Sequence, residues 1–216
     1  ETALSTVMQN IIDDKTLDVS QGIIHHSEGV DLLPSNIEMS GFEVRLINAM
    51  SRERVLKTYV NEVKKNYDYV LIDCMPSLGM ITINALAAAD SVIIPTQPHY
   101  LSAKGLELLL RSVSMVKRQI NPKLRIDGIL MTMVMPRTNI SKEITATVKS
   151  AYGKKIKVFD TEIPHSIRAV EATAEGKSIF AYDKSGKVAA AYEQLGKEVA
   201  EIGEKQRNQN RADRIR

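Results

Sequence analysis

The sequence predicts an α/β fold in which helices cover both faces of a doubly wound, mostly parallel sheet. Short apolar runs alternate with segments of helical periodicity along most of the 216 residues, and this alternation is typical of such sheets. Connections are short, and no internal repeat or low-complexity linker interrupts the alternation. Because 44% of the residues are hydrophobic, the chain can bury a sizeable core. We therefore expect a single domain over residues 1–204 and a separate tail over residues 205–216.

The first half of the chain is expected to contain helices at residues 2–14, 42–50 and 52–66. The apolar spacing within the third of these predicts a buried face made of Val55, Tyr59, Val60 and Val63. A short strand is expected at residues 29–36, with Pro34 closing it. Residues 67–73, with the sequence YDYVLID, are too apolar to alternate. Such a run predicts a strand that is covered on both faces.

The second half is expected to contain helices at residues 81–90, 101–120, 139–153, 166–176 and 187–204. The strands expected between them are residues 91–96, 124–134 and 155–164. Asn121-Pro122 ends one of the helices, because the residue before a proline avoids the helical region. Gly153 is placed to end another.

Charge and cysteine content limit the possible function classes. The formal net charge is +3, but the tail KQRNQNRADRIR holds five basic residues and one acidic residue. This tail is expected to be solvated and disordered, and an arm that contacts nucleic acid is the alternative. Cys74 is the only cysteine, so a disulfide framework is excluded and a small buried residue beside the site is expected. No apolar run approaches the roughly 20 residues that span a bilayer, and no signal peptide is visible, so a cytoplasmic protein is expected.

Asp73 ends the apolar run at residues 67–73 and is the first candidate site residue. Ligands of open parallel sheets bind beyond the carboxyl ends of the strands. A carboxylate there can hold Mg²⁺, usually through water, beside nucleotide phosphates. The alternative is an acid that caps the next helix or pairs with a basic side chain. Pro76, Ser77 and Gly79 follow at once, and a loop of this composition could respond to a γ-phosphate.

Residues 67–109 resemble the Walker B and switch II region of ParA/Soj-type partition ATPases, which belong to the deviant-Walker MinD/ParA superfamily. The segment DCMPSLG is followed by TINAL, by a strand with the sequence IIP and by a Gly-Leu pair, although Met75 stands where the family commonly has proline. The resemblance continues through MTMVMPRTNISKEI and TEIPHSIRAVEATAEGKSI. It implies a P-loop NTPase-like AAA domain that binds ATP with Mg²⁺, dimerises around the nucleotide and holds DNA non-specifically.

The resemblance also assigns roles to individual residues. Asp73 would order Mg²⁺ through water, and the switch would consist of Pro76, Ser77 and Gly79. A pocket for the nucleotide base would be formed by Met133, Asn139, Ile163 and Pro164. DNA phosphates would be contacted by Arg137 and Arg168, for which the alternative is two solvated arginines at helix ends. The chain departs from the family at Met135, where aspartate is common, and at His165, where arginine is common.

The phosphate-binding loop G-x-x-x-x-G-K-[ST] does not occur in these 216 residues. Each Gly-Lys pair lacks the required glycine five positions earlier, where the sequence has Val148, Glu171, Ala181 and Ala191. The catalytic site is therefore incomplete within this sequence, and the fragment by itself is expected to be inactive. Two hypotheses remain: the C-terminal portion of an intact ATPase, lacking its first strand, or a truncated module that binds DNA or a partner without turnover.

The resemblance also implies partners. An intact protein of this family would form an ATP-dependent homodimer, would bind DNA of a plasmid, chromosome or mobile element, and would be stimulated by a ParB-like centromere-binding protein. It would be cytoplasmic and associated with the nucleoid. A membrane-bound regulator of the MinD type would need an amphipathic C-terminal helix. After Ile202 only Ala212 and Ile215 are apolar, so no membrane partner is expected.

Overall fold

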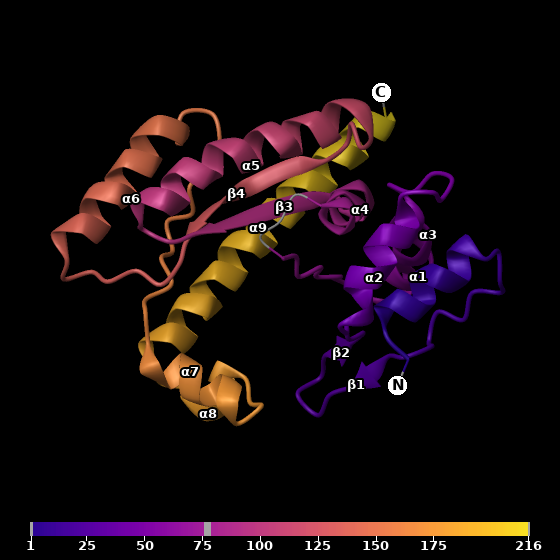
Figure 1. Cartoon of the computed structure of the whole chain (residues 1–216). Coiled ribbons are helices and arrows are strands. Elements are labelled where there is room, and N and C mark those ends of the chain that lie inside the picture. Colours follow the sequence, from indigo (N-terminus) through magenta and orange to yellow (C-terminus); the bar gives the residue numbers. More distant parts are fainter. Residues whose placement is uncertain (1, 76–78, 216) are drawn as a thin grey trace. The chain divides into compact units, whose positions relative to one another are not determined.

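The computed structural model describes residues 2–75 and 79–215 of the chain (Figure 1). It divides into two compact units. Unit 1 consists of residues 1–90 and 111–125, and unit 2 consists of residues 91–110 and 126–216. Each unit has a hydrophobic core of its own. The single domain expected over residues 1–204 stays a prediction.

Unit 1 is mainly helical. Its elements are α1 (Leu4–Ile12), α2 (Glu38–Leu46), α3 (Val55–Val63), the 3₁₀ turn η1 (Lys64–Asn66) and α4 (Met80–Ala88). One core joins the four α-helices, with Met8, Phe42, Leu56 and Ala85 among its buried members. The predicted face of α3 is confirmed, because all four of its apolar residues are buried.

The second half of α5 (Tyr100–Gln119) and a short antiparallel hairpin complete unit 1. The strands of the hairpin are β1 (Ile24–His25) and β2 (Asp31–Leu32). The Asp31 carboxylate lies 2.6 Å from His25 Nδ1 and accepts a hydrogen bond of 2.5 Å from the Tyr67 hydroxyl. The bond from Tyr67, and after it the contact with His25, lowers the pKa of Asp31. The hairpin is thereby attached to the start of the predicted strand at residue 67.

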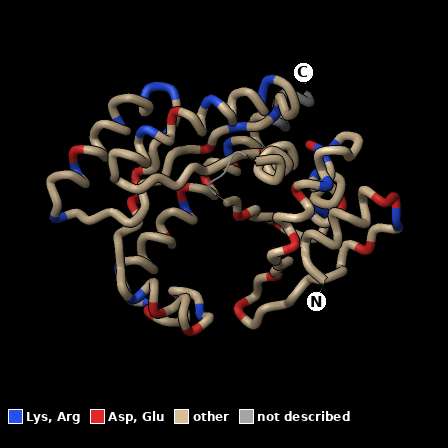
Figure 2. The backbone as a smooth tube through the Cα atoms, in the orientation of Figure 1, with Lys and Arg blue, Asp and Glu red and all other residues tan. Residues whose placement is uncertain are grey.

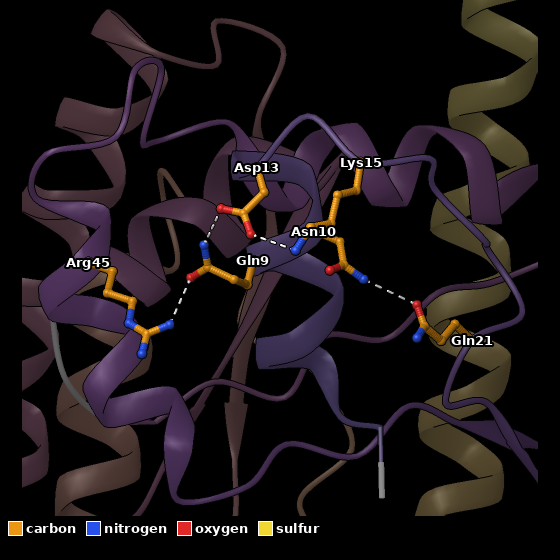
Figure 3. A network of polar contacts seen from close by, with 6 residues as sticks. All are labelled: Gln9, Asn10, Asp13, Lys15, Gln21 and Arg45. Carbon is orange, nitrogen blue, oxygen red and sulfur yellow. Dashed lines mark hydrogen bonds and ion pairs between the residues drawn. The ribbon is translucent and has the colours of Figure 1, made fainter.

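A polar network on the surface of unit 1 joins α1 to α2 (Figure 3). Gln9 donates a 2.7 Å hydrogen bond to Asp13 and accepts a 3.2 Å hydrogen bond from Arg45. Lys15 approaches the other oxygen of Asp13 at 2.9 Å. Lys15, and then Gln9, lowers the pKa of the Asp13 carboxyl group. These contacts are exposed and therefore contribute little to stability. They orient α1 relative to α2, while the apolar core stabilises the packing of the two helices.

Unit 2 contains a sheet between helices. Its elements are β3 (Ser91–Thr96), the first half of α5 (Tyr100–Gln119), β4 (Arg125–Met131), α6 (Asn139–Tyr152), α7 (Ile167–Ala174), α8 (Ile179–Tyr182) and α9 (Lys187–Ile215). The strands β3 and β4 are hydrogen-bonded neighbours joined by the crossover helix α5. In Figure 1 they lie between α5 and α9.

Neighbouring residues on these strands face different cores, as the pleat of a strand requires. Ile94 and Ile129 pack in the core that includes side chains of α5 and α6. Ile93 and Leu130 pack in the core that includes side chains of α9. Both faces of the sheet are therefore covered by helices, and the predicted mixed α/β fold with a parallel sheet is confirmed.

The structure corrects the predicted strand at residues 67–73. These residues have no strand conformation, and Leu71 is 92% exposed. The apolar composition suggested burial between two layers, but a strand also needs a neighbour with which to exchange backbone hydrogen bonds. Among the described residues, no ladder hydrogen bond to residues 68–73 is formed.

The C-terminal tail also differs from the expectation. α9 continues to Ile215, so residues 205–215 are helical where a disordered tail was expected. Lysine, arginine, glutamine and alanine make up seven of these eleven residues, and all of them are good helix formers. None of the helices in the described ranges is both long enough and apolar enough to cross a membrane.

Candidate functional site

Asp73 lies at the end of an exposed, irregular segment of unit 1. Tyr69 is 57% exposed, and Asp73 itself is exposed. Within the described ranges, no three acidic, histidine or cysteine side chains gather where they could hold a metal ion. A single free-standing carboxylate fits a magnesium ion whose other ligands are water and phosphate oxygens. It does not fit a metal site made by protein side chains alone.

Cys74 is exposed, contrary to the expected buried residue. Its thiol lies 3.8 Å from the carbonyl oxygen of Ile72. Partial desolvation of the thiol, and then the negative charge of Asp73, raise the pKa of Cys74. A raised pKa keeps the thiol protonated at neutral pH, so Cys74 is not an activated nucleophile.

Two of the predicted switch residues, Pro76 and Ser77, lie outside the described residues. Gly79, the third, precedes α4 directly and takes the position of its N-cap. A Cβ atom on Gly79 would collide with the Glu43 carboxylate, which extends from α2. The same carboxylate accepts a 3.4 Å hydrogen bond from the Ile81 amide in the first turn of α4. An alanine at residue 79 would therefore displace the Glu43 carboxylate from the first turn of the helix that follows the switch.

Asn84 is a residue of this region to which sequence reasoning gave no role. It belongs to the TINAL segment and is fully buried. Its amide donates to the carbonyl oxygens of Arg52 and Met80, and its side-chain oxygen accepts from the Leu56 amide. Asn84 thus ties α4 to the beginning of α3. An asparagine inside an otherwise apolar helix was the available signal, because a buried amide needs hydrogen-bond partners.

Three of the four predicted base-pocket residues, Met133, Ile163 and Pro164, lie at the carboxyl end of β4. A parallel bridge joins Val134 to Pro164. The Val134 amide donates to the Ile163 carbonyl oxygen at 3.0 Å, and the His165 amide donates to the Val134 carbonyl oxygen at 3.0 Å. Met133 is adjacent to this bridge. We call residues 157–165, which run beside β4, the edge segment.

The side chains at this bridge differ in exposure. Met133 is 49% exposed, whereas Ile163 is 5% exposed and packs in the core. Met133 also has φ of +51°, a conformation that is rare for a side chain of its kind and recurs at functional sites. Gln97, which follows β3, approaches the Met133 sulfur at 3.3 Å. The sequence did not indicate Gln97, because its partner lies 36 residues further along the chain.

The loop between β4 and α6 carries the other predicted residues of this unit. Met135 is 41% exposed, and its amide donates a 3.3 Å hydrogen bond to the hydroxyl oxygen of the buried Ser141. Arg137 is exposed, and Asn139 is the exposed first residue of α6. Arg137 on the loop and Asn139 at the start of α6 are therefore both presented to solvent.

Arg168 lies in the first turn of α7. Its guanidinium group is 3.4 Å from Glu171 and 6.0 Å from the centroid of the Tyr182 ring. The Tyr182 hydroxyl donates to the same glutamate at 3.1 Å. The contact with Tyr182, and then the charge of Glu171, raises the pKa of Arg168. Figure 2 shows basic and acidic residues interspersed along the backbone, so a role in binding anions rests on individual arginines.

The structure therefore places the candidate residues in two groups. Asp73 and Gly79 belong to unit 1. The remaining described candidates belong to unit 2, where backbone bonds bring Met133, Ile163 and Pro164 together.

Comparison with known proteins gives consistent similarities. A family model described as an AAA domain matches residues 1–126. The chain is 44% identical over 176 residues to the sporulation initiation inhibitor protein Soj of Bacillus subtilis, covering 82% of this chain and 69% of that protein. It is 36% identical over 196 residues to the chromosome partitioning protein ParA of Myxococcus xanthus, covering 90% and 68%.

A similar solved structure is cobyrinic acid a,c-diamide synthase from Mycobacterium smegmatis with bound ATP analog and magnesium. The TM-score is 0.69 at 29% sequence identity, and the match covers 82% of this chain and 75% of that one. These matches extend over both units of the chain.

Proposed function

Because the chain belongs to the ParA/MinD-type P-loop ATPases, we propose that it is the part of a DNA-partitioning ATPase that carries the magnesium residue, the switch, the base pocket and the DNA contacts. The observation that carries the proposal is the bridge between Val134 and Pro164. It joins two segments, distant in sequence, whose residues were expected to approach a nucleotide base. The 44% identity to Soj supports the same function.

In this proposal, unit 1 contributes the residue for magnesium. Asp73 is an exposed carboxylate and would order the ion through water. Magnesium, when bound, neutralises charge on the phosphates. Gly79 leaves room for Glu43 to cap α4, so that the switch is followed by a helix with a fixed first turn.

Unit 2 contributes the contacts to the base. Met133 and Pro164 would lie against the base, and Asn139 would offer its amide at the start of α6. Ile163 would support them from the core, since its side chain is buried. The phosphate-binding loop would come from a part of the gene product beyond these 216 residues; the match to Soj covers 69% of that protein.

Arg137 and Arg168 would contact DNA phosphates. Contacts of this kind provide affinity without reading the base sequence, and they weaken steeply as salt rises. ATP-dependent pairing of two copies, a ParB-like partner that stimulates hydrolysis and a location on the nucleoid complete the proposal. The DNA that is moved belongs to a plasmid, a chromosome or a mobile element.

The test uses the complete gene product. Changing both Arg137 and Arg168 to glutamate is expected to abolish DNA retention in a filter-binding assay at 100 mM salt, while ATP still binds. The matched control changes the exposed residues Arg118 and Lys123 to glutamate, which alters the charge equally and should leave at least half of the retention. If the first variant retains DNA as well as the unmodified protein does, these arginines do not contact DNA.

The sequence also supports a second candidate, because it contains no phosphate-binding loop. A truncated module would bind DNA or a full-length partner without turnover. If the complete gene product retains DNA but shows no ATP binding by calorimetry, this second function replaces the first.

A further inference from the structure

The pairing between β4 and the edge segment is irregular. The Ile129 amide donates to the Lys157 carbonyl oxygen, and the Phe159 amide donates to the Ile129 carbonyl oxygen, both at 2.9 Å. The next bond runs from the Ile163 amide to the Met131 carbonyl oxygen at 2.9 Å. The acceptors on β4 thus advance by two residues while the donors on the edge segment advance by four. Two residues are additional, and the edge segment bulges away from β4 between Phe159 and Ile163.

Glu198 of α9 occupies this bulge. It is only 8% exposed, and its carboxylate accepts from the Thr161 amide at 2.9 Å and the Thr161 hydroxyl at 2.5 Å. The second oxygen accepts from the Asp160 amide at 3.3 Å and lies 3.2 Å from Lys157 Nζ. The carboxylate therefore takes the place of the carbonyl acceptors that β4 does not supply to the bulge.

Packing fixes the beginning of the bulge. Phe159 is fully buried, and its ring lies against β4 at Gly128, where a Cβ atom would come within 2.7 Å of the ring. Lys157 Nζ is 5.0 Å from the centroid of the same ring. The bulge is thus held on one side by the ring and along its length by Glu198.

The bulge determines which residues Ile163 and Pro164 pair with along β4 and the residues that follow it. Without the two additional residues, Thr161 would take the bond to Met131 that Ile163 makes. Every later residue would then be displaced along β4 by two positions. The meeting of Pro164 with Val134, beside Met133, depends on the bulge being kept.

We propose that Glu198 is a positioning residue for nucleotide binding: it stabilises the bulge and so aligns Pro164 with Met133 as one surface for the base. The proposal rests on the proposed function of this site. Glu198 itself does not touch the base. It acts through the backbone of residues 160–164.

The test measures binding to the complete gene product by calorimetry, with ATP and with inorganic tripolyphosphate as probes. Glu198→Ala is expected to weaken ATP binding about tenfold and to leave tripolyphosphate binding unchanged, because tripolyphosphate has no base. Glu198→Gln keeps the volume and one acceptor, and should weaken ATP binding about threefold. The control is Glu193→Ala, since Glu193 is an exposed residue of the same helix whose partner is Lys197.

Each result has a defined meaning. If ATP and tripolyphosphate weaken equally, or if neither changes, Glu198 has no positioning role and the inference is overturned. If Glu198→Ala does not fold, Glu198→Gln and Thr161→Val, which replaces the hydroxyl group with a methyl group, decide the question by the same two probes. If the unmodified gene product binds neither probe, the proposed function fails before the role of Glu198 is reached.

Discussion

Residues 67–79 of unit 1 and the edge segment of unit 2 both carry candidate site residues, but different contacts hold them. The edge segment is fixed by backbone bonds to β4 and by the buried carboxylate of Glu198. In unit 1, Leu71 is almost fully exposed and Asp73 is exposed. Near the switch, α4 is held by hydrogen bonds of Glu43 and Asn84. The segment proposed to contact the base is thus held by contacts within unit 2, whereas the segment proposed to order magnesium is followed by a helix that is itself anchored.

The largest effect is expected at Asn84. Asn84→Ala leaves the Leu56 amide and two carbonyl oxygens without their partner inside the core of unit 1. The free energy of unfolding should fall by about 3 kcal/mol, measured by urea denaturation of the 216-residue chain. Asn61→Ala, on the exposed face of α3, is the control and should change it by less than about 0.5 kcal/mol. A loss below about 1 kcal/mol for Asn84→Ala would show that α4 is anchored by other contacts.

The next effect concerns the packing of the edge segment against β4. Gly128→Ala places a Cβ atom 2.7 Å from the Phe159 ring and 3.0 Å from the Lys157 carbonyl oxygen, and should cost about 2 kcal/mol. Gly105→Ala in α5 is the control, because a Cβ atom there meets nothing within 4 Å. It should stabilise the chain by about 0.5–1 kcal/mol through helix propensity. Equal effects in thermal denaturation would mean that the ring does not fix the bulge.

Elements that depend on contacts between residues close in sequence could be predicted from the sequence, whereas features that depend on distant residues could not. β3 was predicted at residues 91–96 and is found there, because a short apolar run lies between Asp90 and the turn at Pro98. α5 was predicted within one residue at each end. Both predictions rest on local periodicity and local breakers, which a single sequence contains.

The remaining features arise from partners distant in sequence. The strand predicted at residues 155–164 is interrupted, because Glu198, 37 residues beyond Thr161, stabilises a bulge there. The apolar run at residues 67–73 resembled a buried strand, yet strand formation depends on a neighbour that composition cannot identify. Among the candidate residues, the grouping of Met133 with Pro164 was expected from the family resemblance, whereas the roles of Glu43 and Glu198 became visible only in the structure.

Acidification should distinguish the two regions further. Burial by itself would raise the pKa of Glu198, but the hydrogen bonds from Thr161, together with Lys157 and Asp160, outweigh it and lower the pKa below the ordinary 4.5. Because the pKa is lower in the folded chain, the stabilising contribution is complete above the unfolded pKa and disappears as the pH falls through the folded pKa.

The corresponding measurement is the free energy of unfolding between about pH 6 and pH 3. Glu198→Gln should make its decline with falling pH shallower than in the unmodified chain. Glu201→Gln, on an exposed position of α9, should retain the original slope. If the two variants have the same slope, the Glu198 carboxylate does not stabilise the bulge as an anion.

The smallest effect is expected where Glu43 caps α4. Glu43→Ala and Gly79→Ala should each cost about 0.5–1 kcal/mol, because the second substitution displaces the Glu43 carboxylate from the Ile81 amide. The double variant should cost less than the sum of the two, by about 0.5 kcal/mol. A double-mutant cycle by urea denaturation measures this coupling. If the costs of the two substitutions are strictly additive, Gly79→Ala does not act through the Glu43 cap.

Release of phosphate from ATP tests the central claim most directly. It is measured for the complete gene product and for the 216-residue chain, each with and without Asp73→Ala. We expect magnesium-dependent hydrolysis by the complete product, a loss of at least about tenfold on Asp73→Ala, and no release by the 216-residue chain. Steady release by the 216-residue chain that Asp73→Ala abolishes, or hydrolysis by the complete product that Asp73→Ala leaves intact, would contradict the account.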